Sequence, residues 1–249
     1  MTFQTNRLAA AIAFGCLLAA TPASAQQSWT GLFVGVGGGY GSANAEITGR
    51  PGPAAILAGV PANVAIGFDG LGLDGAMLSL AAGADYQFNS KFVAGVFFDY
   101  DFQRLSSGAS ANGGGAFGIN AASATAEVDS TLAIGARLGY LISPTTLWYV
   151  TAGYTRADAD KLAGSANVGM GTFSGSLDLP SFSGYFIGGG VESQMMSNLS
   201  VKLEYRYSDY GKEQLDLSPI HPLANDYVIV EMEPTAQMVR ASINYRFGK

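Results

Sequence analysis

Hydrophobic and polar residues alternate with a period of two in about eight separate stretches of the chain. The clearest stretch is 198–209, where apolar or aromatic residues occupy every second position. Its apolar face is Leu199, Val201, Leu203, Tyr205 and Tyr207, and its polar face is Ser200, Lys202, Glu204, Arg206 and Ser208. Because successive side chains of a strand point to opposite sides, this period predicts β-strands. The expected strands cover 30–41, 77–88, 92–103, 127–141, 147–157, 184–193, 198–209 and 239–247.

The connections between these strands are alternately short and long. Three short turns lie at 89–91, at 143–145 and just before Asn198, and four long connections cover 42–76, 104–126, 158–183 and 210–236. We expect the long connections to be mobile surface loops, because they are rich in Gly, Ala, Ser and Asn. Residues 226–230 are expected to extend the last strand above the membrane, with Pro234 forcing a break or bulge.

The apolar faces are unbroken and carry aromatic residues at their ends, as a wall between two membrane interfaces requires. No apolar run reaches the roughly 18–20 residues that a spanning helix needs. Only 13% of the 249 residues are charged, and 34 are glycine. A closed barrel is the other structure that satisfies every backbone group in lipid. The pattern therefore predicts an all-β, eight-stranded antiparallel up-and-down transmembrane β-barrel, in which glycines of the first strand relieve crowding at the wall.

The first 25 residues have the features of a secretory signal peptide. Arg7 supplies the positive charge, 8–20 form the apolar core, and Ala23-Ser24-Ala25 is a small-residue cleavage site. We therefore expect a cleaved signal peptide at 1–25, export through the general secretory pathway, and a barrel domain at 26–249. Cys16 could serve a lipoprotein signal, but the apolar core continues past it. Cleavage of the signal peptide removes Cys16, the only cysteine, and leaves the mature chain without a thiol for disulfides.

The polar faces of the strands carry charges that would point into the barrel. The predicted network holds Asp85, Asp99, Asp129, Glu192 and Glu204 against Arg137, Lys202, Arg206, Arg240 and Arg246. The inner face of 92–103 also includes Gly95 and Asp101. Eight strands enclose only enough space for side chains or one small ligand. Since buried charges persist only when paired, we expect an ion-pair network, either as structural support or as a charged constriction that passes small solutes.

Several short segments, spread over the mature chain, resemble one family. Residues 29–35, Trp-Thr-Gly-Leu-Phe-Val-Gly, resemble the start of that family's first strand. Residues 200–207, Ser-Val-Lys-Leu-Glu-Tyr-Arg-Tyr, and residues 239–247 resemble its seventh and eighth strands, and 137–140 and 149–153 resemble its central strands. Together they resemble the Omp25/Omp31-type outer-membrane β-barrels of α-proteobacteria, porin-like surface antigens. The resemblance implies an OmpA/OmpX-like barrel, exposed at the cell surface, that tethers or stabilises the envelope. Some relatives bind haem, and the family has no catalytic residues to carry over.

Outer-membrane barrels usually end on an aromatic residue that the barrel-assembly machinery reads. Here Tyr245 and Phe247 form the expected insertion signal, although Gly248 and Lys249 follow them. The alternation survives up to Phe247, so we expect the chain to be inserted.

Few residues suggest chemistry beyond the barrel. His221 is the only histidine and lies between Pro219 and Pro222, near Ser218, Asp216 and Glu213, without a recognisable hydrolase motif. Haem binding, which the resemblance suggests, would use His221 or a loop tyrosine, Tyr210 or Tyr227, as the axial ligand. Asp158 and Asp160, with Asp69 or Asp74, could form a cation site, but scattered loop carboxylates are usually only solvated. We therefore expect no enzyme, no metal and no resident cofactor.

The formal net charge of −6 disfavours a nucleic-acid partner. The expected partners are outer-membrane lipid, lipopolysaccharide and the assembly machinery, with haem or host surface molecules as further candidates. Three hypotheses remain: a structural envelope barrel, a small-solute pore or haem-binding receptor, and, least favoured, an outer-membrane enzyme.

Overall fold

The structure is a computed structural model that describes residues 28–63, 66–111, 121–167, 172–178, 180–215 and 224–247. The predicted signal peptide at 1–25 lies outside the described residues. Eight long strands form the barrel: β1 (Gly31–Pro51), β2 (Ile66–Gln87), β3 (Phe92–Ala111), β4 (Ala121–Ser143), β5 (Thr146–Asn167), β7 (Phe182–Gln194), β8 (Leu199–Asp209) and β10 (Val228–Arg246). The shorter elements are β6 (Thr172–Asp178), β9 (Glu213–Leu215), α1 (Pro53–Leu57) and α2 (Ala224–Tyr227).

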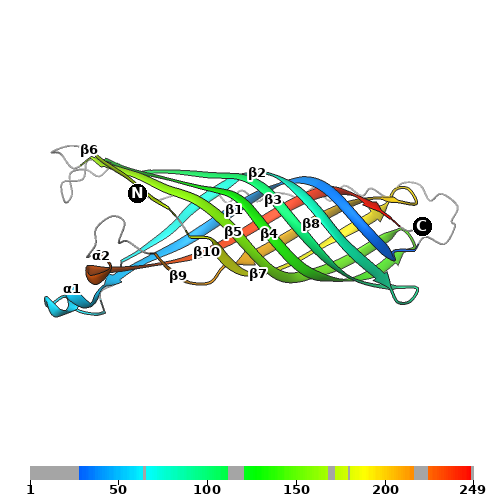
Figure 1. The fold of residues 1–249 in the computed structure, drawn as a ribbon, viewed down its shortest axis with the longest axis horizontal. Helices are drawn as coiled ribbons and strands as arrows, with labels where there is room; N and C mark the ends of the chain where they lie inside the picture. The colour runs from blue at the N-terminus through cyan, green and yellow to red at the C-terminus, as the bar shows by residue number, and fades with distance from the viewer. Residues whose placement is uncertain are drawn as a thin grey trace, which may run out of the picture.

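The eight long strands close into a barrel. Each pairs antiparallel with its neighbour in the order β1-β2-β3-β4-β5-β7-β8-β10, and β10 returns to pair with β1. Figure 1 shows the resulting cylinder, with its strands inclined to the long axis. Inclined strands are the geometry that closing a sheet requires. The predicted eight-stranded up-and-down barrel is confirmed. Among the described residues, no helix is long and apolar enough to cross a membrane.

The strands continue far beyond the lengths predicted from the sequence. The long connections were expected to be surface loops, and where the structure describes them this was mostly wrong: β3 and β4, for example, stay paired up to Ala111 and Ala122. The expected extension of the last strand over 226–230 is borne out from Val228 onward, where β10 pairs with β1. Small polar residues form a ladder as well as a loop, because pairing satisfies backbone donors and acceptors whatever the side chains are. The barrel therefore carries an extended β-structure beyond the expected membrane span.

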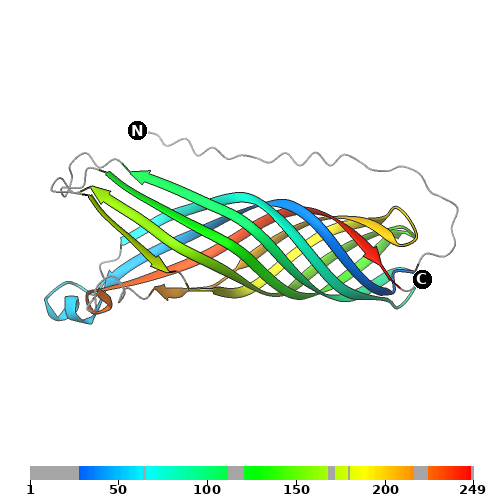
Figure 2. The same cartoon turned by 45° about the horizontal axis from the view of Figure 1, so that its top comes forward.

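This extended end of the barrel divides into two arms. The β2–β3 ladder ends at Asp74 and Ser106, whereas each strand continues to pair with its other neighbour. One arm contains the ends of β1, β2 and β10 with β9, α1 and α2; the other contains the ends of β3, β4 and β5 with β6. The two arms point apart in Figures 1 and 2, with the start of β6, beside the end of β5, away from α1 and α2.

Pro234 does not break the last strand, contrary to expectation. It lies inside β10 opposite Ala45, and the register between β10 and β1 is regular there. The backbone N–H of Tyr210 donates to the Pro234 carbonyl (3.1 Å). The carbonyl and nitrogen of one residue point to the same side of a strand, so the proline nitrogen faces β8. The β8–β10 ladder ends at Thr235, the residue after Pro234. The backbone N–H that proline lacks is therefore not one that this ladder needs.

The side chains separate into a lipid-facing wall and a filled interior. The outward positions are large and apolar, and Leu32, Val96 and Val150 are each more than 60% exposed. Aromatic side chains gather at both ends of this wall. Tyr86, Phe88, Phe92, Tyr140, Trp148, Tyr245 and Phe247 lie toward the short turns, and Tyr40, Phe102, Tyr154 and Tyr185 lie toward the other end. Two such girdles mark the interfaces of a transmembrane barrel.

Glycines on the inner wall provide the room for this interior. Gly35, Gly37 and Gly39 of β1 face Asn244, Ser242 and Arg240 of β10 in register. A methyl group added at any of the three would collide with β10. The glycines of the first strand therefore relieve crowding at the barrel wall, as predicted, and leave room for the inward side chains of β10.

We expect Gly153→Ala to destabilise the barrel by about 1–3 kcal/mol, because overpacking forces neighbouring groups to shift. The new methyl group would meet the Ile134 carbonyl oxygen and the Phe186 ring. Gly38→Ala is the matched control, since Gly38 points outward and its nearest added contact is 3.4 Å. Urea unfolding of the refolded protein measures both. Equal stability of the two variants would contradict this account of the inner glycines.

Candidate functional site: the barrel lumen

The barrel interior holds most of the charged side chains that the sequence places on inner faces. Nine of the ten predicted residues are buried there. These are Asp85, Asp99, Arg137, Glu192, Lys202, Glu204, Arg206, Arg240 and Arg246, each at most 5% exposed. They form two layers, which we call the lower layer, near the short turns, and the upper layer, further along the axis.

The lower layer joins Asp85 of β2, Arg137 of β4, Glu192 of β7 and Arg246 of β10. Arg137 donates to both Asp85 oxygens and, through Nη1, to Glu192 Oε2 (2.7 Å). Arg246 Nη1 donates to Asp85 Oδ2 (2.7 Å), and its Nη2 lies 3.6 Å from Glu192 Oε1. Two acids and two bases thus form a closed ring of ion pairs across the lumen.

Neutral side chains complete the lower layer. Ser200 Oγ (2.5 Å) and Asn244 Nδ2 (3.2 Å) both donate to Glu192 Oε1. Arg246 Nη1 also donates to the backbone carbonyl of Trp29 (2.6 Å), and its guanidinium lies over the Trp29 ring at 5.3 Å. Trp29 itself is fully buried and donates through Nε1 to the Pro144 carbonyl (3.2 Å). The start of the barrel is therefore anchored to its last strand and to a short turn.

The upper layer contains three acids and three bases. Arg240 Nη2 donates to Asp99 Oδ2 (2.5 Å) and to Glu204 Oε1 (2.7 Å). Arg206 Nη2 donates to the same two oxygens at 2.6 and 2.9 Å. Lys202 Nζ lies 3.6 Å from the other Glu204 oxygen. Two guanidinium groups thus share two carboxylates, which are the partners that charges buried in low dielectric require.

Asp101 is the third acid of the upper layer, and the predicted network left it out. It is fully buried, accepts from Ser79 Oγ, and lies 3.3 Å from Arg240 Nη1. The signal was present in the sequence, because Asp101 follows the inward Asp99 by two positions on the same strand. With Asp101, the buried charged side chains that the structure describes in the lumen are five acids and five bases.

Asp129 was predicted to join this network, and that was wrong: its side chain is exposed. The register of β4 against β5 shifts between Val128 and Ser130, and that of β3 against β4 shifts between Phe102 and Leu105. Such bulges add a residue and break the alternation of faces. Ser130 and Thr131 are consequently both buried, while Asp129 turns outward.

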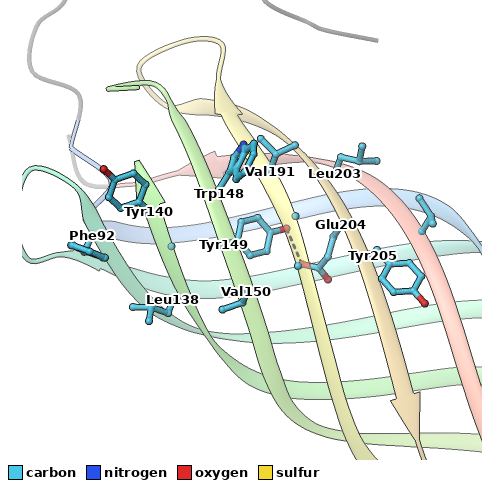
Figure 3. A pocket seen from close by; sticks show the side chains of 14 residues that line it. Phe92, Leu138, Tyr140, Trp148, Tyr149, Val150, Val191, Leu203, Glu204 and Tyr205 are labelled. Carbon is cyan, nitrogen blue, oxygen red and sulfur yellow. Dashed lines mark hydrogen bonds between the residues drawn. The ribbon is translucent and has the colours of Figure 1, made fainter. Parts of the chain in front are cut away.

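Aromatic side chains separate and support the two layers. Arg137 lies over the rings of Phe33 (4.9 Å) and Tyr149 (5.5 Å), and Arg206 lies over Phe186 (4.1 Å). Tyr149 also connects the layers, since its hydroxyl donates to Glu204 Oε2 (2.9 Å), as Figure 3 shows. Cation–π contacts contribute about 2 kcal/mol or more where water is excluded. The sequence signal for Tyr149 is its place between the outward Trp148 and Val150.

Three buried apolar clusters fill the remaining lumen. Trp29, Val93, Leu141, Leu147 and Tyr149 lie at the short-turn end; Phe33, Phe97, Ala133 and Phe186 lie between the charged layers; Ala45, Ala157, Phe182, Tyr210 and Met232 lie toward the opposite end. Among the residues that the structure describes, charged and apolar groups therefore alternate along the barrel axis.

The other residues singled out in the sequence lie away from this network. His221, Asp216, Ser218, Gly248 and Lys249 are outside the described residues, as are the side chains of Asp69 and Asp160. Tyr210 is buried in the apolar cluster at the far end, and Tyr227 is exposed on α2. Asp158 pairs with Arg156 (3.4 Å), and Asp74 accepts from Tyr40. The parts of the chain that can be described bring no three His, Cys, Asp or Glu side chains together as metal ligands.

The aromatic residues of the predicted insertion signal lie on the outer wall. Tyr245 and Phe247 are both exposed, and their rings pack edge to face with centroids 5.0 Å apart. The Phe247 N–H donates to the Leu32 carbonyl (2.8 Å). The last described residue, Phe247, is therefore paired to the first strand, and it presents its ring to lipid together with Tyr245.

We expect Asp101→Asn to lower the free energy of unfolding by about 1–3 kcal/mol, because it weakens the partner of a buried guanidinium. Asp129→Asn serves as the matched control and should change stability by no more than about 0.5 kcal/mol, as an exposed substitution. Urea unfolding, followed by the fluorescence of the chain's two tryptophans, measures both. A larger loss at Asp129 than at Asp101 would contradict the assignment of the two carboxylates.

Comparison with known proteins identifies the family. The family model described as the outer membrane protein beta-barrel domain matches residues 9–247. The 31 kDa outer-membrane immunogenic protein of Brucella melitensis is 25% identical over 98% of this chain and 95% of its own length. The 22 kDa outer membrane protein of Rhizobium leguminosarum is 33% identical over 32% of this chain and 33% of its own.

A solved structure, the outer membrane protein OprG from Pseudomonas aeruginosa, has 13% identity and a TM-score of 0.48, covering 89% of this chain and 99% of that one. The predicted resemblance to α-proteobacterial outer-membrane proteins is confirmed by the curated relatives. The chain belongs to the outer membrane protein β-barrel domain family and is a protein of the bacterial outer membrane.

Proposed function

We propose that this protein is a non-catalytic, non-conducting barrel that supports the integrity of the outer membrane and presents its two arms at the cell surface. The main support for the proposal is the filled lumen: among the described side chains, five acids and five bases are paired there, each no more than 5% exposed. The structural role is thus favoured over the solute pore by the way the interior is occupied.

A solute moving along the axis would have to cross both charged layers. Separating a buried pair leaves uncompensated charges at a cost of about 3–5 kcal/mol. In the upper layer one guanidinium contacts three carboxylates, since Arg240 pairs with Asp99, Asp101 and Glu204. Opening the layer therefore breaks several pairs at once. The apolar clusters on each side add no polar path, so the lumen supports closure rather than passage.

The two arms support the surface-exposed part of the proposal. Short turns of outer-membrane barrels face the periplasm, so the long strand extensions belong outside the cell. Paired strands hold these extensions in a defined shape, unlike unpaired loops. The Brucella relative is named an immunogenic protein. By analogy, the arms of this chain would be the part that antibodies or host molecules meet.

The refolded protein in planar bilayers should give no large, stable conductance steps. Arg240→Ser should remain silent as well, because the lower layer and the apolar clusters still fill the lumen. Arg50→Ser is the matched control, since Arg50 pairs with Glu231 near the far end and is largely exposed. Stable steps in the wild type that grow with Arg240→Ser and not with Arg50→Ser would establish the solute-pore alternative.

A strain without this protein should admit more of a hydrophobic dye and become more sensitive to detergent, because the barrel no longer supports its membrane. Dye uptake and detergent survival measure the effect, and expression of the wild type should restore both. An inserted variant lacking only the surface arms separates the two parts of the proposal. An unchanged barrier in the deletion strain would contradict the envelope role.

A further inference from the structure

The outer wall of the barrel contains an apolar trench of about 550 Å³. Its sides come from β3, β4, β5, β7, β8 and β10. Figure 3 shows Trp148, Val150, Leu203 and Tyr205 standing along it, while Tyr149 points inward to Glu204. An exposed apolar depression on a wall that faces lipid is a place where a particular chain could bind rather than slide past.

The trench follows two adjacent rows of cross-strand neighbours. The first row is Phe92, Tyr140, Trp148, Val191 and Leu203, each paired with the next across the ladder. The second row is Leu138, Val150, Gly189, Tyr205 and Val239. Gly189 has no side chain between two large neighbours, Val150 and Tyr205. This gap in the second row deepens the trench.

The trench runs obliquely into the membrane. Rows of paired residues lie across the strands, and the strands are inclined to the barrel axis (Figure 1). One end of the trench, at Phe92 and Tyr140, therefore lies at the periplasmic girdle, and the other end, at Tyr205 and Val239, lies deeper in the wall. Five strand spacings of about 4.8 Å give a length of roughly 24 Å. An extended acyl chain fits such a shape.

The side chain of Lys91 places a positive charge at the periplasmic end of the trench. Lys91 is exposed in the short turn after β2, and its Nζ lies 5.8 Å from the centre of the Tyr140 ring. The other exposed cations whose side chains are described pair with carboxylates: Arg50 with Glu231, Arg156 with Asp158 and Lys212 with Glu233. Lys91 has no carboxylate partner among the described residues. Its charge is available to an anion at the level of the lipid headgroups.

We propose that this trench binds one anionic phospholipid of the periplasmic leaflet. The phosphate lies beside Lys91, and an acyl chain lies along the trench over Gly189. The periplasmic position of Lys91 selects the inner-leaflet lipid, and the elongated, oblique form of the trench, which crosses six strands, suits a chain better than the rounded wall of a second barrel. The site is independent of the closed lumen, so a conducting barrel would leave it intact.

The chain contains its own probe for this site. It has two tryptophans: Trp148 in the trench is 57% exposed, and Trp29 in the lumen is fully buried. Brominated acyl chains quench tryptophan only at close contact, so quenching reports lipid at Trp148 over a constant background from Trp29. The experiment uses the full mature protein in phosphatidylethanolamine vesicles that contain a small fraction of brominated lipid, either phosphatidylglycerol or phosphatidylethanolamine.

At equal mole fraction, brominated phosphatidylglycerol should bind about fivefold more tightly than brominated phosphatidylethanolamine, the preference that one lysine at a membrane surface provides. Lys91→Gln should abolish this preference while the protein still folds, because the turn is exposed. Lys212→Gln, at the other end of the barrel, is the matched control and should retain it.

A second variant tests the trench independently of the charge. Gly189→Leu should fill it and reduce quenching by both lipids, whereas Gly38→Leu adds the same side chain to the outward face of β1 and should not. Equal quenching by the two lipids in the wild type would overturn the proposal and leave ordinary, unselective lipid contact. An absence of quenching by either lipid would overturn it too, and would indicate that a second copy covers Trp148.

Discussion

The pairing of β1 with β10 is the constraint on which the rest of the structure depends. In lipid, an unpaired strand edge exposes a row of donors and acceptors that nothing else can satisfy, so the sheet must close. Closure brings a strand with a glycine-rich inner face against a strand that carries Arg240, Asn244 and Arg246. The same contact therefore satisfies the backbone and admits the long side chains that fill the lumen.

Two independent requirements meet in that lumen. An eight-stranded barrel has too little interior for bulk water, yet its inner faces are polar so that the outer faces can be apolar. Pairing acids with bases meets both requirements, and aromatic rings such as Phe33 and Phe186 occupy the space that guanidinium groups leave. A wholly apolar interior would remove the difference between the two faces of each strand, and with it the register that the alternation specifies.

The sequence predicted the wall of the barrel and most of its interior because both depend on a period of two. Glu204, Arg206 and Arg240 are placed by that period alone, and so is Asp101 when the alternation is followed to its end. The period fails where the backbone departs from it. The bulge near Asp129 turns that side chain from the inner to the outer face, and no local feature of the sequence marks it.

The strand extensions were missed for another reason, since small polar residues are compatible with both loops and ladders. The trench depends on neighbours across six strands, which only the register reveals.

The distribution of the lumen charges along the chain couples electrostatics to the order of assembly. The first three strands of the barrel supply Asp85, Asp99 and Asp101, and the last two supply four bases, Lys202, Arg206, Arg240 and Arg246, against one acid, Glu204. A partly assembled sheet therefore carries unbalanced charge on its inner face, which is costly to hold in a membrane. Only the arrival of β10 neutralises both layers. We therefore expect insertion to be cooperative. A barrel that lacks its last strand has a net charge in both layers, whereas the closed barrel has acids and bases in equal number in each.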